Sequence, residues 1–158
     1  MQAEQTTAIW EKRIEAEVRS YYFAALAESY TKRKQWLTGS SFFLSSGAAA
    51  TIVAKSPDYI PIIMALVSAL CNAYSIATAL DRRISTLAKL KNEWSSLAAE
   101  YENLYYHWFD DDSEQVFNEL VKRGRDASQL GSTDAAPYNP ELMKKWEEWV
   151  FARYKVAA

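Results

Sequence analysis

The sequence predicts an all-α protein: a membrane helical hairpin joined to long cytoplasmic helices that pack as a coiled-coil-like bundle. No charged residue occurs from Gln35 to Ala54 or from Tyr59 to Leu80, and a helix of about 20 apolar residues crosses the bilayer core. After Arg83, leucines and aromatic residues recur every seven residues, which predicts a packed helical seam. Glycine and proline number four each, and no alternating run of β-branched residues favours a strand.

Residues 1–34 are predicted to form an N-terminal cytoplasmic helix. Trp10, Ile14 and Val18 recur at four-residue spacing and give this helix one apolar stripe, which needs a partner. No proline or glycine occurs between Ala8 and Thr38, so the helix could continue directly into the first span.

The two-transmembrane hairpin is predicted over residues 35–80, with spans at 35–54 and 59–80. Small and hydroxylated residues dominate the first span, and their four-residue spacing lets two helices approach closely and form hydrogen bonds. The second span carries one polar stripe, with Asn72 well inside the bilayer, where a polar amide usually faces another helix or water. The residues predicted to line a pore or a helix interface are Thr38, Ser41, Ser45, Ser68, Asn72, Ser75 and Ala79.

The charges around the hairpin predict its topology. The connection between the spans carries only Lys55 and Asp58, whereas basic residues flank the outer ends of both spans. By the positive-inside rule, both termini are predicted to be cytoplasmic. The net charge of −2 gives no basic field for nucleic acid, so anionic headgroups explain the local basic residues better. These membrane-flanking basic residues are Lys32, Arg33, Lys34, Arg82 and Arg83.

Residues 81–109 are predicted to form a cytoplasmic heptad helix that continues directly from the second span. Large aromatic residues in the seam disfavour a tight parallel dimer. We therefore expect the seam to pair with the N-terminal helix of the same chain, with further contacts between subunits. The seam comprises Leu87, Leu90, Trp94, Leu97, Tyr101, Leu104 and Trp108.

Residues 110–158 are predicted to form a C-terminal helical tail. Asp112 and Ser113 supply a cap for a helix that ends at Gly124, followed by a loop at 125–138. Asn139 and Pro140 then predict the start of a last helix that reaches about residue 154.

No enzyme motif occurs in the sequence. A metal or acid–base site would need His107 and the run Asp110 to Asp112, but no second histidine follows at i+4 and these aspartates lie where a helix needs caps. The single cysteine, Cys71, excludes an intrachain disulfide and a cysteine-based metal site. We therefore predict no enzyme activity, no metal and no cofactor.

The order of these elements resembles the SLATT family of bacterial two-transmembrane proteins. The resemblance covers residues 8 to about 109: a basic step at residues 31–34, two spans with a minimal connection, Asp81-Arg82-Arg83, and a long helix with Trp94 and Tyr101. It implies an inner-membrane effector in anti-phage or other conflict systems that forms oligomeric pores. The implied partners are the lipid bilayer, copies of the same chain, and a nucleotide-signalling or sensor protein.

A homo-oligomeric, pore-forming membrane effector is therefore the predicted function. Two alternatives stay open. The first is a non-conducting membrane scaffold or partner subunit, whose function would depend on the seam more than on the polar stripe. The second is a soluble helical-bundle interaction protein, in which the two uncharged segments would form the core.

Overall fold

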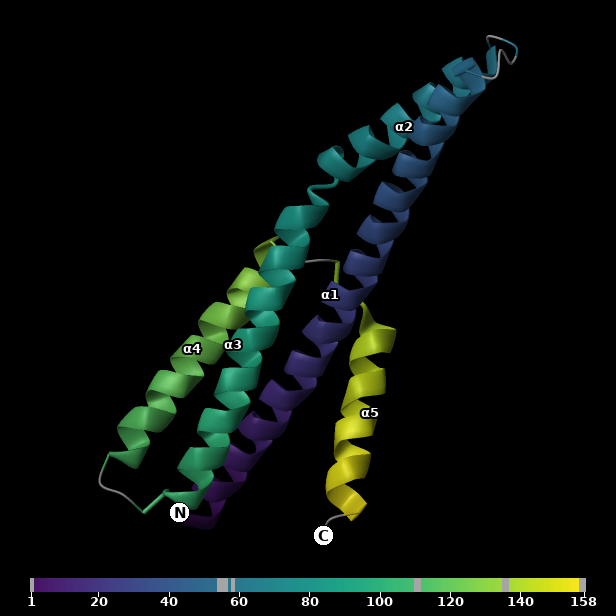
Figure 1. Cartoon of the computed structure of the whole chain (residues 1–158). Coiled ribbons are helices and arrows are strands. Elements are labelled where there is room, and N and C mark those ends of the chain that lie inside the picture. Colours follow the sequence, from purple (N-terminus) through teal and green to yellow (C-terminus); the bar gives the residue numbers. More distant parts are fainter. Residues whose placement is uncertain (1, 54–56, 58, 110–111, 135–136, 157–158) are drawn as a thin grey trace. The chain divides into compact units, whose positions relative to one another are not determined.

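The computed structural model describes residues 2–53, 57, 59–109, 112–134 and 137–156. Over these residues the chain is helical without a strand, so the all-α prediction is confirmed. The helices are α1 (Gln2–Val53), α2 (Tyr59–Ala77), α3 (Leu80–Tyr106), α4 (Ser113–Asp134) and α5 (Pro140–Val156) (Figure 1).

The chain divides into two compact units. Met1–Ala27 and Ser85–Ala158 form one unit, which we call the bundle. Glu28–Ile84 forms the other, which we call the hairpin. The first part of α1 belongs to the bundle and the second part to the hairpin. The two parts form one continuous helix because no proline interrupts it.

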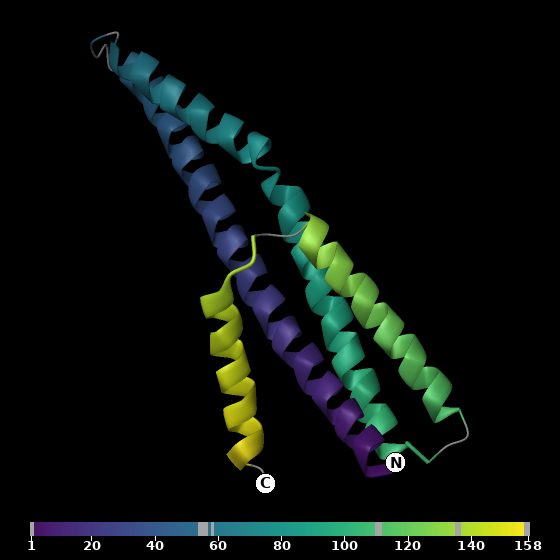
Figure 2. The same cartoon turned by 180° about the vertical axis from the view of Figure 1, so that it is seen from behind.

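In the hairpin, the second part of α1 packs against α2, and both views show the two helices side by side (Figure 2). Serine side chains join them: the Oγ atoms of Ser41 and Ser68 lie 2.9 Å apart. Pro61 lies in the first turn of α2, where its missing N–H costs no helical hydrogen bond.

The prediction that the heptad helix continues directly from the second span is wrong. Helix α2 ends at Ala77 and α3 begins at Leu80, with Ala79 between them in the left-handed conformation at φ 46°. The Thr78 hydroxyl donates a hydrogen bond to the carbonyl of Tyr74 (2.8 Å), and the Ala79 amide bonds to Ile76 three residues back. Such bonding tightens the last turn before a left-handed residue and ends the helix.

In the bundle, α3 packs between the first part of α1 and α4, and α5 packs on α1 (Figure 1). Six of the predicted seam residues of α3 belong to the core of the bundle: Leu87, Leu90, Trp94, Leu97, Tyr101 and Leu104 are buried, and Trp108 is half-buried. On the other side of α1, Ile14 and Val18 form a second cluster with Val150 of α5. The apolar stripe of α1 is therefore shared between two neighbouring helices.

The predicted loop at 125–138 is wrong over residues 125–134, because α4 continues through Gly124 and Gly131 to Asp134, whereas residues 137–138 are outside any helix. A glycine in a helix costs about 1 kcal/mol relative to alanine, but tertiary packing outweighs that cost here. Gly124 lies against the indole ring of Trp94, and Ala127 one turn later is buried. A Cβ atom at Gly131 would lie only 3.2 Å from Cζ of Phe23, so this glycine permits a close approach to α1.

The start of α5 agrees with the predicted cap. The Leu142 amide donates a hydrogen bond to Oδ1 of Asn139 (3.1 Å), as expected for an asparagine that precedes a helix. The backbone amide of Asn139 donates to the Tyr22 hydroxyl (3.0 Å), which attaches the start of α5 to α1.

Candidate functional site

Polar side chains meet inside the hairpin. Ser41 is 6% exposed and Ser68 is 4% exposed, although serine is mostly an exposed residue. The Oγ of Ser45 lies 2.8 Å from that of Ser68, and the Ser41 hydroxyl donates to Oδ1 of Asn72 (3.1 Å). We call Ser41, Ser45, Ser68 and Asn72 the serine cluster.

The hydrogen bonds of the serine cluster can be satisfied together. Each hydroxyl has one proton to donate. Ser41 can donate to Asn72 while Ser68 donates to the backbone carbonyl of Ser41 (3.1 Å). Ser45 then donates to Oγ of Ser68 or to the Ser41 carbonyl one turn earlier (2.8 Å). The cluster therefore links α1 and α2 without leaving a buried serine hydroxyl unpaired.

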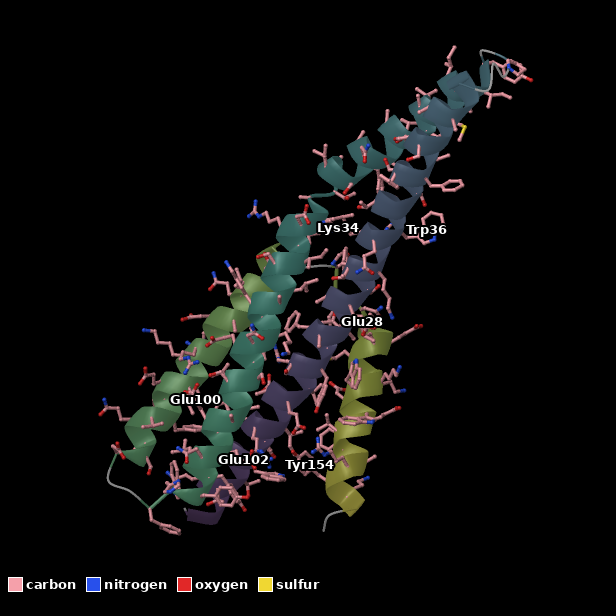
Figure 3. The ribbon with its side chains drawn as sticks, in the orientation of Figure 1. Glu28, Lys34, Trp36, Glu100, Glu102 and Tyr154 are labelled. Carbon is pink, nitrogen blue, oxygen red and sulfur yellow. The ribbon has the colours of Figure 1, made fainter. Side chains whose placement is uncertain are left out.

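Apolar side chains face outward from the same two helices. Phe42 on α1 is 75% exposed and Ile76 on α2 is 80% exposed. Figure 3 shows the Trp36 side chain projecting from α1. A soluble helix pair normally buries its apolar side and exposes its polar side, so the hairpin has the opposite arrangement. The exposed large apolar residues of the hairpin are Trp36, Phe42, Phe43, Tyr59, Ile62, Ile63, Leu66, Val67, Leu70, Tyr74 and Ile76.

Among the described residues, one helix, Tyr59–Ala77 (α2), is long and apolar enough to cross a membrane by length and composition. Its most apolar window is only 6% buried. The second part of α1 carries more hydroxyl groups, and the structure gives one candidate span, not two. Most of the predicted connection, residues 55, 56 and 58, lies outside the described part of the chain, as does residue 54 at the end of the predicted first span.

The structure brings together four of the residues predicted to line a pore or helix interface, namely the serine cluster. Thr38 is exposed on α1 and Ser75 is half-buried on α2, and neither belongs to the cluster. Ala79 lies at the break between α2 and α3. The predicted polar stripe of the second span is therefore divided between a contact inside the hairpin and positions outside it.

Three of the predicted membrane-flanking basic residues form contacts within the hairpin. Lys32 pairs with Glu28 on its own helix (2.6 Å), and its hydrogen bond lowers the pKa of that carboxyl. The Arg33 guanidinium donates to the Tyr74 hydroxyl (2.6 Å) and lies 5.4 Å from the centre of the Tyr74 ring. Lys34 pairs with Asp81 at the start of α3.

Sequence reasoning missed the contacts that Arg33 and Lys34 make. A hairpin brings the beginning of its first helix close to the end of its second. The opposite charges of Lys34 and Asp81 at these two ends were therefore a signal for the ion pair. From the sequence alone, Arg33 and Lys34 only indicate the topology of the predicted spans.

The seam of α3 contacts two helices of its own chain. On one side, the Arg19 guanidinium of α1 lies 4.7 Å from the centre of the Trp94 ring. On the other side, Tyr101 meets Phe117 of α4 with ring centres 6.3 Å apart. Burial raises the pKa of Tyr101 to about 12, so this phenol stays protonated at neutral pH. In this chain the seam is therefore an intrachain packing surface.

An arginine joins α4 to α3 across the same surface. Arg123 contacts Glu93 (2.8 Å) and Glu100 (2.6 Å), and the hydrogen bond with Glu100 is the main reason that the pKa of Arg123 is raised. Partial burial alone would raise the pKa of Glu100. The hydrogen bonds that Glu100 accepts from Ser96 and Arg123, together with the positive charge of Arg123, outweigh this effect, so the pKa of Glu100 is lowered. Because the tail lacked a predicted partner, sequence reasoning did not find this contact.

Aromatic rings and one carboxylate attach α5 to α1. Tyr21 stacks on Trp146 with ring centres 5.2 Å apart, and Glu17 accepts hydrogen bonds from Arg153 (3.2 Å) and Tyr154. Figure 3 shows Tyr154 between the two helices. Burial, together with the hydrogen bond to Glu17, raises the pKa of Tyr154 to about 12.

The residues weighed for acid–base or metal chemistry lie apart from these contacts. His107 is exposed, and its Nδ1 lies 2.9 Å from the carbonyl oxygen of Asn103 one turn earlier. Asp110 and Asp111 lie outside the described residues. In the part of the chain that the structure describes, no three histidine, cysteine, aspartate or glutamate side chains are grouped so that they could hold a metal ion.

Comparison of the chain with protein-family models, with curated proteins and with solved structures found no match. The resemblance to the SLATT proteins therefore stays a prediction. Any function has to be argued from the geometry of the hairpin and the bundle.

Proposed function

We propose that this protein is a homo-oligomeric membrane effector, whose hairpin lies in the bilayer and whose bundle lies in the cytoplasm. On activation it forms pores in, or disrupts, the bacterial inner membrane as part of a defence or conflict system. The observation that carries the proposal is the arrangement of the hairpin, with Ser41 and Ser68 buried between its two helices and the large apolar side chains outside.

The outward apolar side chains favour a lipid environment over water. Transfer of one such side chain out of water is worth about 1.5–3 kcal/mol, and the hairpin exposes many of them on both helices. The soluble-bundle alternative would require these residues to be the core. Over the described residues most of the core lies instead in the bundle, for example at Leu87, Leu97 and Val150.

The serine cluster supports two spans instead of one. If α2 crossed the membrane alone, Ser68 and Asn72 would face hydrocarbon without hydrogen-bond partners, which is unfavourable. With the second part of α1 beside it, both residues have partners on Ser41. Exposed aromatic residues on α1, Phe42 and Phe43, give this helix a lipid-facing side of its own.

The basic residues set the proposed topology. Lys32, Arg33 and Lys34 precede the first span, and Arg82 and Arg83 follow the second. Positive residues prefer the cytoplasmic side and anionic headgroups, so both termini and the bundle are placed in the cytoplasm.

The proposed assembly of several copies uses polar residues that are exposed on the hairpin. Ser41 and Ser68 are buried between the two helices, so contacts with other copies, or a lumen between copies, would use the exposed Thr38 and the exposed Asn72, whose Oδ1 also accepts the hydrogen bond from Ser41. Intramembrane amides usually face a partner helix or water. Asn72 is therefore the most informative position for a test.

The experiment is dye release from liposomes that contain anionic phospholipid and the purified full-length protein. We expect leakage, and we expect Asn72→Leu to reduce its rate severalfold. Ala69→Leu is the matched control, because Ala69 is exposed on the same helix and has no polar group to lose. The proposal fails if the protein stays soluble without detergent, or if it inserts and no condition tested gives leakage.

A non-conducting scaffold is the second candidate, and one observation favours it. The bundle has a groove of about 450 Å³ between α1, α3 and α5, lined by small residues of α3 such as Ser95, Ala98 and Ala99. Small residues let another helix approach closely. If the protein inserts without leakage, and Ala98→Trp abolishes its cellular activity while Asn72→Leu does not, the scaffold function is supported and the pore is not.

A further inference from the structure

The break between α2 and α3 is held in a conformation that its sequence does not favour. Ala79 has a φ of 46°, where the Cβ atom of an L-residue crowds the following carbonyl. Glycine is the usual residue at such a position, whereas alanine is the strongest helix former. A non-glycine residue stays in this region only where its surroundings impose it.

Those surroundings include two contacts from consecutive residues of α1, beside the local hydrogen bonds of Thr78 and Ala79 and the burial of Leu80. Arg33 binds the hydroxyl and ring of Tyr74, which lies before the break, and Lys34 pairs with Asp81, which lies after it. Because α1 has no interruption at these positions, it fixes both sides of the break at once. We call these two interactions the hinge contacts.

The hinge contacts are weak enough to be reversible. The Lys34 side chain is 40% exposed and that of Asp81 is 78% exposed, and exposed ion pairs contribute little because water and salt screen them. The local sequence favours the alternative, since no glycine or proline occurs between Pro61 and Gly124. Exposed contacts on one side and a local preference for helix on the other are the conditions under which a segment can adopt two arrangements.

We propose that residues 78–79 are a hinge that the Arg33 and Lys34 contacts hold in a bent state, and that activation releases these contacts so that α2 and α3 join as one helix. The role in activation rests on the proposed membrane function. The existence of two states does not rest on that function, because it is inferred from the strained Ala79 and from the contacts around it. An element with two discrete arrangements is what converts a small local signal into a large movement.

The test measures a distance and not leakage. Nitroxide labels are attached to cysteines introduced at Ala69 and Ser85, both exposed, in the full-length protein with Cys71→Ser, reconstituted in lipid. In a continuous helix these positions, 16 residues apart, would be separated by about 24 Å along the axis. Pulsed electron paramagnetic resonance should resolve this distance from the shorter one of the bent state.

Three changes should alter the populations in stated directions. Ala79→Gly removes the strain and should raise the ratio of bent to straight by roughly fivefold to thirtyfold. Ala79→Val, with a β-branched side chain that tolerates this conformation poorly, should lower the ratio. The double variant Arg33→Gln with Lys34→Gln should also lower it, since both hinge contacts are lost.

Lys32→Gln is the matched control, because Lys32 pairs with Glu28 on its own helix and does not reach α2 or α3. Retained helical circular dichroism shows that each variant is folded. The proposal is overturned if Ala79→Gly and Ala79→Val leave the same distance distribution, or if Lys32→Gln shifts it as far as the double variant does. Shifted populations without dye release would support the hinge and count against the pore, whereas dye release with unshifted populations would do the reverse.

Discussion

The hairpin buries small polar residues between its helices and exposes large apolar ones. Ser41 and Ser68 are buried against each other, while phenylalanine and isoleucine side chains on the same helices are exposed. Each hydrogen bond between helices in a membrane contributes only about 0.6 kcal/mol on average. The serine cluster therefore fixes the pairing of α1 with α2 more than it stabilises the hairpin.

At the same scale, Arg123 makes the bundle sensitive to acid. Because the pKa of Glu100 is lowered in the folded state, its contribution to stability is present above the unfolded pKa of about 4.3 and is lost as the pH falls through the folded value. We expect Arg123→Gln to lower the thermal midpoint at pH 7 and to make that midpoint fall less between pH 5 and pH 3. Circular dichroism melting of the two proteins measures this.

Lys122→Gln is the control for that prediction, because Lys122 is exposed on the neighbouring position of α4. It removes the same charge without removing the contacts to Glu93 and Glu100. A pH dependence that is equal in the wild-type protein and in Arg123→Gln would contradict the prediction.

At the scale of elements, the two glycines of α4 have opposite roles. A Cβ atom at Gly124 would lie 3.8 Å from the Trp94 ring, an ordinary contact, whereas one at Gly131 would lie 3.2 Å from Phe23. Gly124→Ala should therefore stabilise the protein by up to about 1 kcal/mol through helix propensity. Gly131→Ala should give less, or a loss, because the Phe23 ring has to move.

Urea unfolding followed by circular dichroism compares the two variants directly. Both substitutions add the same methyl group to the same helix, and the Phe23 ring is the one neighbour closer than ordinary van der Waals contact. The difference between their free energies of unfolding therefore reports mainly the contact with Phe23. Equal stabilisation by both variants would show that Phe23 moves without cost.

The elements also show how far sequence reasoning reaches. The uninterrupted α1, the cap at Asn139 and the apolar positions of α3 follow from spacing and local chemistry, and all are present. The break at Ala79 could not be predicted, because neither threonine nor alanine signals one and the contacts from Arg33 and Lys34 are tertiary. The prediction of a loop after Gly124 is wrong for the same reason, because packing against Trp94 and Phe23 stabilises the helix despite the low helix propensity of glycine.

The candidate site was predicted in part. The spacing of Ser41, Ser45 and Ser68 indicated a helix interface, and the structure places them at one. Spacing alone did not say which helix would be the partner, because a contact within one chain and a contact between copies need the same small residues.

At the scale of the whole molecule, the number of spans is the property to establish. Two spans place Ser29 and Asn92 on the same side of the membrane, whereas α2 alone would place them on opposite sides. With Cys71→Ser as background, we expect single cysteines at Ser29 and Asn92 to be protected from an impermeant maleimide added to intact cells. A cysteine at Pro57 should be labelled.

Permeabilised cells provide the control, since all three cysteines should then react. Labelling of a cysteine at only one of Ser29 and Asn92 in intact cells would show that the chain crosses the membrane once. The serine cluster would then need a different explanation.

The bundle is discontinuous along the chain, and this determines the order in which the protein can be completed. Its first part precedes the hairpin, and the rest begins at Ser85. At about 5–20 residues per second, the ribosome needs several seconds to synthesise the hairpin between these parts. During that time the stripe with Ile14 and Val18 has no α3 or α5 to cover it. A finished bundle can therefore form only on a chain whose hairpin has already been synthesised, and under the proposed membrane function its completion would follow the insertion of the hairpin.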